Sequence, residues 1–282
     1  MTSLHRALHE QGGSSDVYEL FAVKYATNQK RMRRDNFLPP HDAHDAPMPM
    51  DFYVWVAASR KRLVLIDAGA DEATCRQRGH EFLQCPTEGL AALGRHADEV
   101  SDVIVTHMHW DHAGNFEKFA NARLHVHPRE MAHATGPCMC QPFLRRPYSV
   151  DQVCSLVRSL YAGRLKFTST GEQIAPGITV HHVGGHTPGL QVTSVNTARG
   201  IVVIASDAMH YFGNRDLGIP FPVVSDVGEY LAAFGRIDAL ATSRDHVIPG
   251  HDPAVTELYP SVNSRLGKLI VRIDVAPRST VG

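Results

Sequence analysis

The sequence has no apolar run long enough to cross a membrane and no excess of charge of either sign. A membrane-spanning helix needs about 20 consecutive apolar residues, and no segment of this 282-residue chain approaches that length. The chain carries 28 lysines and arginines against 29 aspartates and glutamates. This balance gives no electrostatic reason to expect a nucleic acid or an anionic membrane as a partner. The opening residues also lack the apolar core of a secretory signal.

Cysteine is scarce and odd in number, whereas histidine is abundant. Five cysteines argue against a disulfide framework and favour a reducing, cytoplasmic location. The composition is 43% apolar and 20% charged, which is typical of a globular protein and excludes global disorder. The chain contains 18 histidines, and imidazole is the commonest metal ligand. These features direct attention to a metal site.

Two segments are distinguished by composition. Residues 1–16 are polar, with glycine and serine near their end, and they predict an N-terminal tail or an arm ordered by a second copy of the chain. Such an arm would be compatible with a homodimer. Residues 17–282 alternate strand-like and helix-like patterns, which predicts a layered α/β domain.

Runs of β-branched, aromatic and aliphatic residues mark the strands, and apolar spacing marks the helices. The predicted strands are 17–25, 52–57, 62–66, 103–105, 124–126, 178–180, 191–195, 201–205 and 246–248. The predicted helices are 89–93, 150–160 and 227–240, and 137–147 is expected to be irregular.

The strongest chemical signal is the run Thr106-His107-Met108-His109-Trp110-Asp111-His112, directly after a predicted strand. Alternate residues of an extended segment face the same way, so His107 and His109 can bind one ion together. Asp111 and His112 can then face a second ion beside the first. The alternative is a polar loop with incidental histidines, which four ligand-type residues at this spacing make improbable.

The same chemistry returns at the ends of later strands. His186 lies in a glycine-rich turn, Asp207 follows the strand 201–205, and His251 follows Ile248-Pro249-Gly250. The candidate ligands form a first set of His107, His109 and His186, a second set of Asp111, His112 and His251, and a bridging carboxylate, Asp207. Imidazole and carboxylate ligands suit two divalent ions, with zinc favoured and iron, manganese or cobalt also compatible.

Together, the motifs HxHxDH at 107–112, GGHT at 184–187, SDA at 206–208 and PGH at 249–251 resemble the metallo-β-lactamase superfamily. The resemblance extends from about residue 18 to residue 251. It implies a four-layer αβ/βα sandwich with a binuclear metal site at one edge of the paired sheets, so that 17–282 would be one hydrolase domain. It also implies a supporting role for Asp67, which is otherwise an ordinary turn residue.

Within the superfamily the chain resembles the N-acyl-homoserine lactone lactonases and their relatives. The supporting runs are 185–191, 206–208 and 248–253. This resemblance implies a quorum-quenching lactonase with a small lactone as substrate. The alternatives are a lactonase of a catabolic intermediate, similar to 4-pyridoxolactonase, and a thioester or ester hydrolase on the same site. A metal-binding protein without turnover and a redox di-iron protein are further alternatives from other classes.

The implied mechanism uses a hydroxide that bridges the two metals as the nucleophile. Asp111 is the candidate for passing the proton to the leaving alkoxide, or else a metal ligand alone. Related lactonases place a tyrosine three positions after the bridging aspartate. This chain has His210 there, with Tyr211 one position later. Either side chain is a candidate for supporting the carbonyl oxygen, and Tyr211 is otherwise a packed aromatic.

The walls of the substrate pocket are harder to predict. The candidates are Met48, Met50, Phe52, the stretch 137–148 with Phe143 at its rim, and Phe221-Pro222. Arg145 and Arg146 could meet a carboxylate, which would suit a charged lactone. Ordinary core packing or solvated surface is the alternative for each of these residues.

Overall fold

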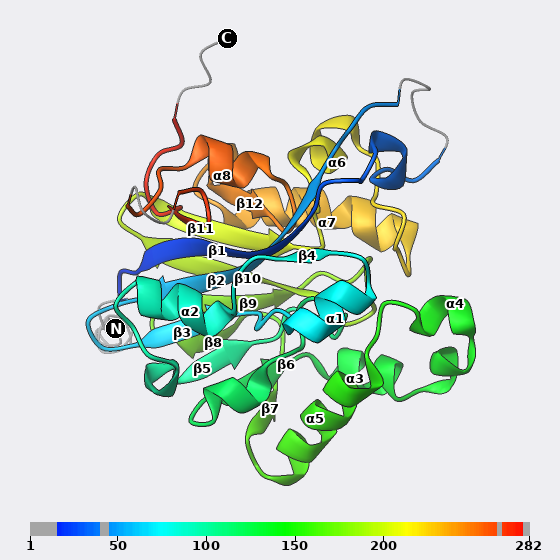
Figure 1. Cartoon of the computed structure of the whole chain (residues 1–282), viewed down its shortest axis with the longest axis horizontal. Helices are drawn as coiled ribbons and strands as arrows, with labels where there is room; N and C mark the ends of the chain where they lie inside the picture. The colour runs from blue at the N-terminus through cyan, green and yellow to red at the C-terminus, as the bar shows by residue number, and fades with distance from the viewer. Residues whose placement is uncertain (1–15, 40–44, 264–266, 279–282) are drawn as a thin grey trace, which may run out of the picture.

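The computed structural model describes residues 16–39, 45–263 and 267–278. Within them, two β-sheets lie against each other in the middle of the molecule (Figure 1). The larger has the order β13-β1-β2-β3-β5-β6-β7, with β4 paired to β1, and the smaller has the order β12-β11-β10-β9-β8. The strands are β1 (Glu19–Asn28), β2 (Met50–Ala58), β3 (Leu63–Ile66), β4 (Glu81–Phe82), β5 (Asp102–Ile104), β6 (Arg123–Val126), β7 (Leu165–Phe167), β8 (Glu172–Ala175), β9 (Ile178–His182), β10 (Gln191–Thr197), β11 (Gly200–Ser206), β12 (Val247–Pro249) and β13 (Ile270–Arg272).

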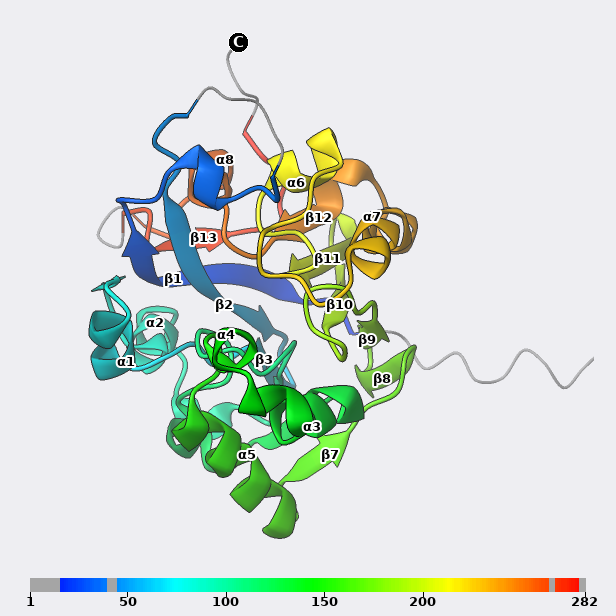
Figure 2. The ribbon, with the colours of Figure 1, turned by 90° about the vertical axis from the view of Figure 1, so that its right-hand side faces the viewer.

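Helices cover the outer faces of the two sheets (Figure 2). On the larger sheet, α2 packs on β1 and α5 packs beside β7, whereas α7 packs on β11 of the smaller sheet. The α-helices are α1 (Glu72–Gln77), α2 (Pro86–Ala92), α3 (Pro128–Ala134), α4 (Pro142–Arg145), α5 (Val150–Tyr161), α6 (Phe212–Leu217), α7 (Val227–Leu240) and α8 (Ala254–Leu258). The short 3-10 helices are η1 (Arg33–Asp35), η2 (Ala97–Glu99), η3 (Phe116–Phe119), η4 (Pro137–Cys140) and η5 (Arg244–His246).

The alternation of side chains along the central strands explains the layers. Successive residues of a strand face opposite sides of its sheet. In β2, Trp55 belongs to the core between the sheets, and its neighbour Val54 belongs to the core beneath the helices. In β11, Ile204 and Val203 divide in the same way. Both faces of both sheets are therefore buried, which confirms the expected four-layer αβ/βα sandwich.

The predicted strands and helices are present with shifted ends, but one prediction was wrong. The stretch 137–147 was expected to be irregular, and the structure instead forms η4 and α4 there. Prolines at the first turn of both helices explain this, because proline is favoured there although it breaks a helix interior. Several elements were not predicted at all, namely the strands β4, β7, β8 and β13 and the helices α1, α3, α6 and α8.

Three further expectations concern the whole chain. Residues 1–15 of the proposed N-terminal tail lie outside the described residues, and the homodimer stays a prediction. Among the described helices, none has both the length and the apolar character that crossing a bilayer requires.

Candidate metal centre

The candidate ligands follow strand ends that meet at one edge of the molecule. β3 and β5 are parallel, so Asp67 and the segment 105–112 emerge side by side. β11 and β12 are also parallel, and they place Asp207 beside His251. Asp67 and Ser206 have φ angles of 62° and 46°. A left-handed backbone is costly for residues other than glycine and often accompanies functional sites.

The structure brings all seven predicted ligands together. Three groups of side chains each offer ligand atoms that lie within 4.8 Å of one another. They are His107, His109, His186 and Asp207; Asp111, His112 and His251; and Asp207, His210 and His251. The first two groups match the two predicted sets. The third shows that His210 also reaches the cluster.

Asp207 lies between the two predicted sets, and its two carboxylate oxygens face different histidines. Oδ1 lies near the second set, 3.2 Å from His112 Nε2 and 3.0 Å from His251 Nε2. Oδ2 lies 3.2 Å from His186 Nε2 and 3.6 Å from His107 Nε2, both in the first set. This geometry is what a carboxylate shared by two ions requires.

The opposite nitrogens of three candidate ligands are held by hydrogen bonds. His112 Nδ1 donates to Asp67 Oδ2 at 2.7 Å, which places Asp67 in the supporting role that the resemblance implied. His186 Nδ1 donates to the carbonyl of Val223 at 2.6 Å, and His251 Nδ1 donates to that of Asp51 at 2.9 Å. Such bonds fix the ring and direct Nε2 toward the other candidate ligands.

The protonation states of the candidate ligands also suit divalent ions. The Nε2 atoms of His107 and His112 are buried and make no hydrogen bond within the described residues. Burial, together with neighbouring imidazoles, lowers the pKa of His107 and His109 well below the usual range. Both rings are therefore neutral at physiological pH, as a metal ligand must be.

The central carboxylate is held in its ionised form. Burial alone would raise the pKa of Asp207, but the surrounding histidines, led by His210 and His112, lower it well below the ordinary value. Burial would likewise lower the pKa of His112, but Asp207, Asp111 and Asp67 raise it well above the usual range. The cluster thus combines two imidazoles of lowered pKa, His107 and His109, with a carboxylate that favours its ionised form and raises the pKa of His112.

His210 and Tyr211, the two candidates for supporting a carbonyl oxygen, point to different places. His210 lines the cavity above the cluster, and its Nε2 lies 3.0 Å from Asp207 Oδ2. The Tyr211 side chain is fully buried, and its hydroxyl donates to the carbonyl of Pro49 at 3.2 Å. Tyr211 is not among the residues that line the cavity. The geometry therefore favours His210.

A cavity of about 1080 Å³ opens over the cluster. Its wall includes most of the predicted pocket residues, namely Met50, Phe52, Phe143, Arg146, Phe221 and Pro222. Met48 packs against the core instead, and Arg145 is exposed outside the cavity.

Sequence reasoning did not single out several polar residues of the site, although Tyr148 lies within the predicted stretch 137–148. Tyr148 and Thr187 line the cavity, and both hydroxyls are buried without a hydrogen-bond partner among the described residues. Arg31, on the loop after β1, also lines the cavity, and no pattern in the sequence indicates it. Glu130 accepts from the backbone N–H of Met108 at 2.9 Å and from that of Gly189 at 2.8 Å, which ties two ligand-bearing loops together.

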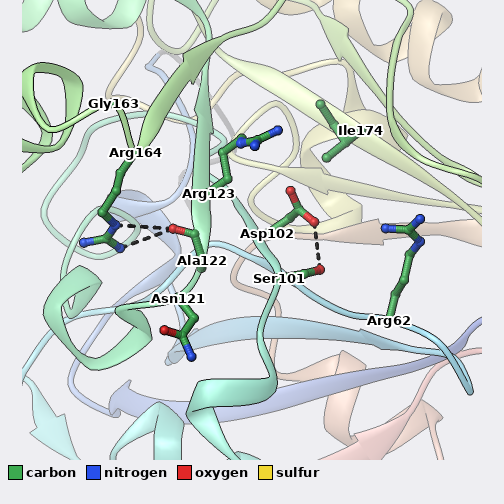
Figure 3. A pocket seen from close by; sticks show the side chains of 9 residues that line it. All are labelled: Arg62, Ser101, Asp102, Asn121, Ala122, Arg123, Gly163, Arg164 and Ile174. Atoms are coloured by element: carbon green, nitrogen blue, oxygen red, sulfur yellow. Dashed lines mark hydrogen bonds between the residues drawn. The ribbon is translucent and has the colours of Figure 1, made fainter.

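A second, smaller cavity of about 400 Å³ lies at the opposite ends of β5 and β6 (Figure 3). Most of its polar groups already form hydrogen bonds within the protein. Arg164 donates to the carbonyl of Ala122, and Asp102 accepts from Ser101 at 2.7 Å and from His125 at 2.7 Å. The chemistry of the molecule is therefore concentrated at the first cavity.

The chain is similar to known lactonases in sequence. Over 189 residues it is 25% identical to an N-acyl homoserine lactonase of a Bacillus species, a match that covers 61% of this chain and 70% of the relative. Over 179 residues it is 29% identical to the N-acyl homoserine lactonase AiiB of Agrobacterium fabrum, which covers 58% of this chain and 61% of the relative. The second match thus spans less than two thirds of the relative.

The fold is also similar to solved structures. A quorum-quenching N-acyl homoserine lactone lactonase superposes with a TM-score of 0.68 at 19% identity, covering 85% of this chain and 94% of that one. The sequence model of the metallo-β-lactamase superfamily matches residues 52–251. That range contains all seven candidate ligands and most of the chain. The chain therefore belongs to the metallo-β-lactamase superfamily.

Proposed function

We propose that this protein is a binuclear metal-dependent hydrolase that opens a lactone ring, with an N-acyl-homoserine lactone as the leading substrate. The observation that carries the proposal is Asp207, whose two oxygens face two separate groups of ligand atoms beneath one cavity. The similarity to N-acyl homoserine lactonases supports the choice of substrate.

Two divalent ions, with zinc favoured, would be held by the seven predicted ligands. His107, His109 and His186 would hold the first, Asp111, His112 and His251 the second, and Asp207 would bridge them. When bound, such ions supply Lewis acidity toward a carbonyl oxygen and an activated water at neutral pH.

Asp111 is the residue we assign to proton transfer. Its carboxylate lines the cavity, where a substrate can reach it. Its backbone is fixed, because Tyr25 donates a hydrogen bond to the carbonyl of Asp111 at 2.7 Å. A carboxylate in this position can take a proton from the attacking water and give it to the leaving alkoxide.

Tyr148 and His210 are assigned to substrate positioning. The Tyr148 hydroxyl is buried, lacks a partner within the described residues and lines the cavity. Its ring lies edge-on to His109, with 4.8 Å between centroids. An unpartnered buried hydroxyl is destabilising until a ligand or water satisfies it. We therefore expect it to donate to an oxygen of the substrate.

The cellular location is part of the proposal. All five cysteines are free thiols, and Cys138 and Cys140 are exposed. Exposed thiols persist in a reducing compartment, which favours the cytoplasm.

A panel of substrates tests the proposal. Metal-loaded protein is given short- and long-chain acyl-homoserine lactones, simple γ- and δ-lactones, an aromatic lactone and a thioester, and proton release is followed with a pH indicator. We expect acyl-homoserine lactones to be opened fastest, with the activity abolished by a chelator. Turnover of another ring alone would indicate a catabolic lactonase, and turnover of the thioester alone would replace the lactonase proposal. Silence across the panel with both ions bound would overturn it.

A further inference from the structure

The cavity wall is cationic in a chain that is nearly neutral overall. Arginines from three separate segments line it, namely Arg31, Arg34, Arg78 and Arg146. Apart from the ligands Asp111 and Asp207, the carboxylate on this wall is that of Asp35. Positive charge gathered in a cleft attracts anions and raises their local concentration.

Two of these arginines are already committed to the protein. Arg34 forms an ion pair with Asp45 at 2.7 Å. Arg78 donates to the carbonyls of Arg146 and Tyr148, at 3.0 Å each, and lies 4.9 Å above the ring of Trp110. The ion pair neutralises the charge of Arg34, and both terminal nitrogens of Arg78 are committed to backbone carbonyls.

Arg31 differs from Arg34, because the partners that hold it among the described residues are neutral. Its Nε donates to the side-chain oxygen of Asn36, and one terminal nitrogen donates to the carbonyl of Asp35 at 2.5 Å. Its guanidinium lies 5.0 Å from the centre of the Phe221 ring. Among the described residues, no carboxylate forms an ion pair with it. Burial lowers the pKa of the half-buried guanidinium, and neighbouring Tyr211 and Asp35 offset only part of this effect.

Arg31 is linked to the candidate metal centre through two aromatic rings. Phe221 stacks on His210, with 3.6 Å between centroids and 9° between planes. His210 in turn lies 3.0 Å from Asp207. A substrate whose ester carbonyl lies over the cluster can therefore place another group beside Arg31.

We propose that the site selects an anionic substrate, a lactone or ester that also carries a carboxylate, and that Arg31 binds this carboxylate. The proposal rests on the hydrolase function proposed above. Because acyl-homoserine lactones carry no carboxylate, it places an anionic lactone or ester above them as the preferred substrate. Arg146 is exposed at the mouth of the same cavity and adds to the attraction. Guanidinium matches a carboxylate in charge and can donate to both of its oxygens.

A matched pair of lactones tests this. Paraconate is a γ-butyrolactone that carries a ring carboxylate, and its carboxamide has nearly the same shape without the charge. We expect the wild-type protein to open paraconate with the higher kcat/KM. Arg31→Gln should reduce the preference for paraconate about ten- to hundredfold, which is the contribution expected of charge-assisted hydrogen bonds. Arg31→Lys keeps the charge and should retain part of the preference.

Arg145→Gln is the control, since Arg145 is an exposed arginine outside the cavity. It should leave the preference unchanged. An equal preference in wild type and Arg31→Gln, or a preference for the carboxamide, would overturn the proposal. Calorimetric binding of paraconate to the metal-loaded protein separates the two proposals. Arg31-dependent binding without turnover of any lactone would sustain the anion site while the hydrolase function fails, and binding indifferent to Arg31 would contradict the anion site itself.

Discussion

Asp67 and His112 are joined by a hydrogen bond of 2.7 Å between Oδ2 and Nδ1, and both side chains are buried. The same carboxylate accepts from the backbone N–H and the hydroxyl of Thr106, at 2.8 Å each. One carboxylate therefore fixes the ring of a candidate ligand and the start of the loop that carries three others.

Asp67→Ala is expected to weaken metal binding without removing a ligand. Loss of a partner that orients a ligand typically costs about ten- to a hundredfold in metal affinity. Competition with a chromogenic chelator measures this for the ion held with His112. Unchanged affinity for both ions would show that the carboxylate has no such role. Asp151→Ala, at an exposed carboxylate on α5, is the matched control.

Asp207→Ala should reduce the number of bound ions below two per chain. The reason is that both proposed sites share this carboxylate, with Oδ1 facing one and Oδ2 the other. Elemental analysis after dialysis gives the stoichiometry. Retention of two tightly bound ions would contradict a bridging role.

Asp111→Asn separates proton transfer from ligation. The amide oxygen can still face an ion, but it cannot accept a proton at neutral pH. We expect kcat to fall about a hundredfold or more, the usual contribution of a general acid–base, while both ions remain. Loss of an ion together with activity would instead make Asp111 a ligand alone.

Tyr148→Phe and Tyr211→Phe should have opposite effects. Tyr148→Phe removes a hydroxyl with no partner in the described protein, so stability should hold while kcat/KM falls about tenfold. Tyr211→Phe removes the bond to the carbonyl of Pro49, so unfolding should become easier by about 1 kcal/mol while turnover is kept. Thermal unfolding measures the stability of both variants, and lactone turnover measures their activity. Full activity in Tyr148→Phe would return the role to Tyr211 or His210.

Stability should decline in mild acid because of His127. Burial, with His182 and Arg129, lowers the pKa of His127 from 6.5 to about 4. The unfolded chain therefore takes up a proton between these pH values and the native protein does not, so stability is lost as pH falls from 6.5 toward 4. Because the His127 ring is partly exposed, solvent screens part of this effect, and the contribution is roughly 2 kcal/mol or less.

His127→Gln checks this, because it removes the titration and keeps an acceptor for the N–H of Arg129, which His127 caps at the start of α3. Urea unfolding gives the free energy of unfolding of wild type and variant at each pH. Plotted against pH, this free energy should differ in slope between the two proteins from pH 4 to 6.5 and have the same slope above pH 8. Parallel curves throughout would refute the assignment.

The ligand set could be predicted from the sequence because its residue types are chemically distinctive and each follows a recognisable strand. The pocket could be predicted only in part. Arg31 and Tyr148 belong to common residue types, and only the packing of distant segments brings them to one wall. Nothing in the sequence indicated Asp51 either, because its backbone carbonyl, rather than its side chain, orients His251. The short helices at 137–145 were missed because proline can begin a helix as well as interrupt one.

The ligands come from strand ends, whereas much of the cavity wall comes from other segments, including the loop after β1, the residues after α1, and the stretch between α3 and α5. Mutations can therefore change the segments of the wall independently of the strand ends that carry the ligands. Substitutions, insertions or exchanged loops in the wall can alter which molecule is accepted without disturbing the residues that act on it. Such modularity makes divergence of substrate range an easy evolutionary path for this chain, and makes its wall the natural place to begin directed evolution.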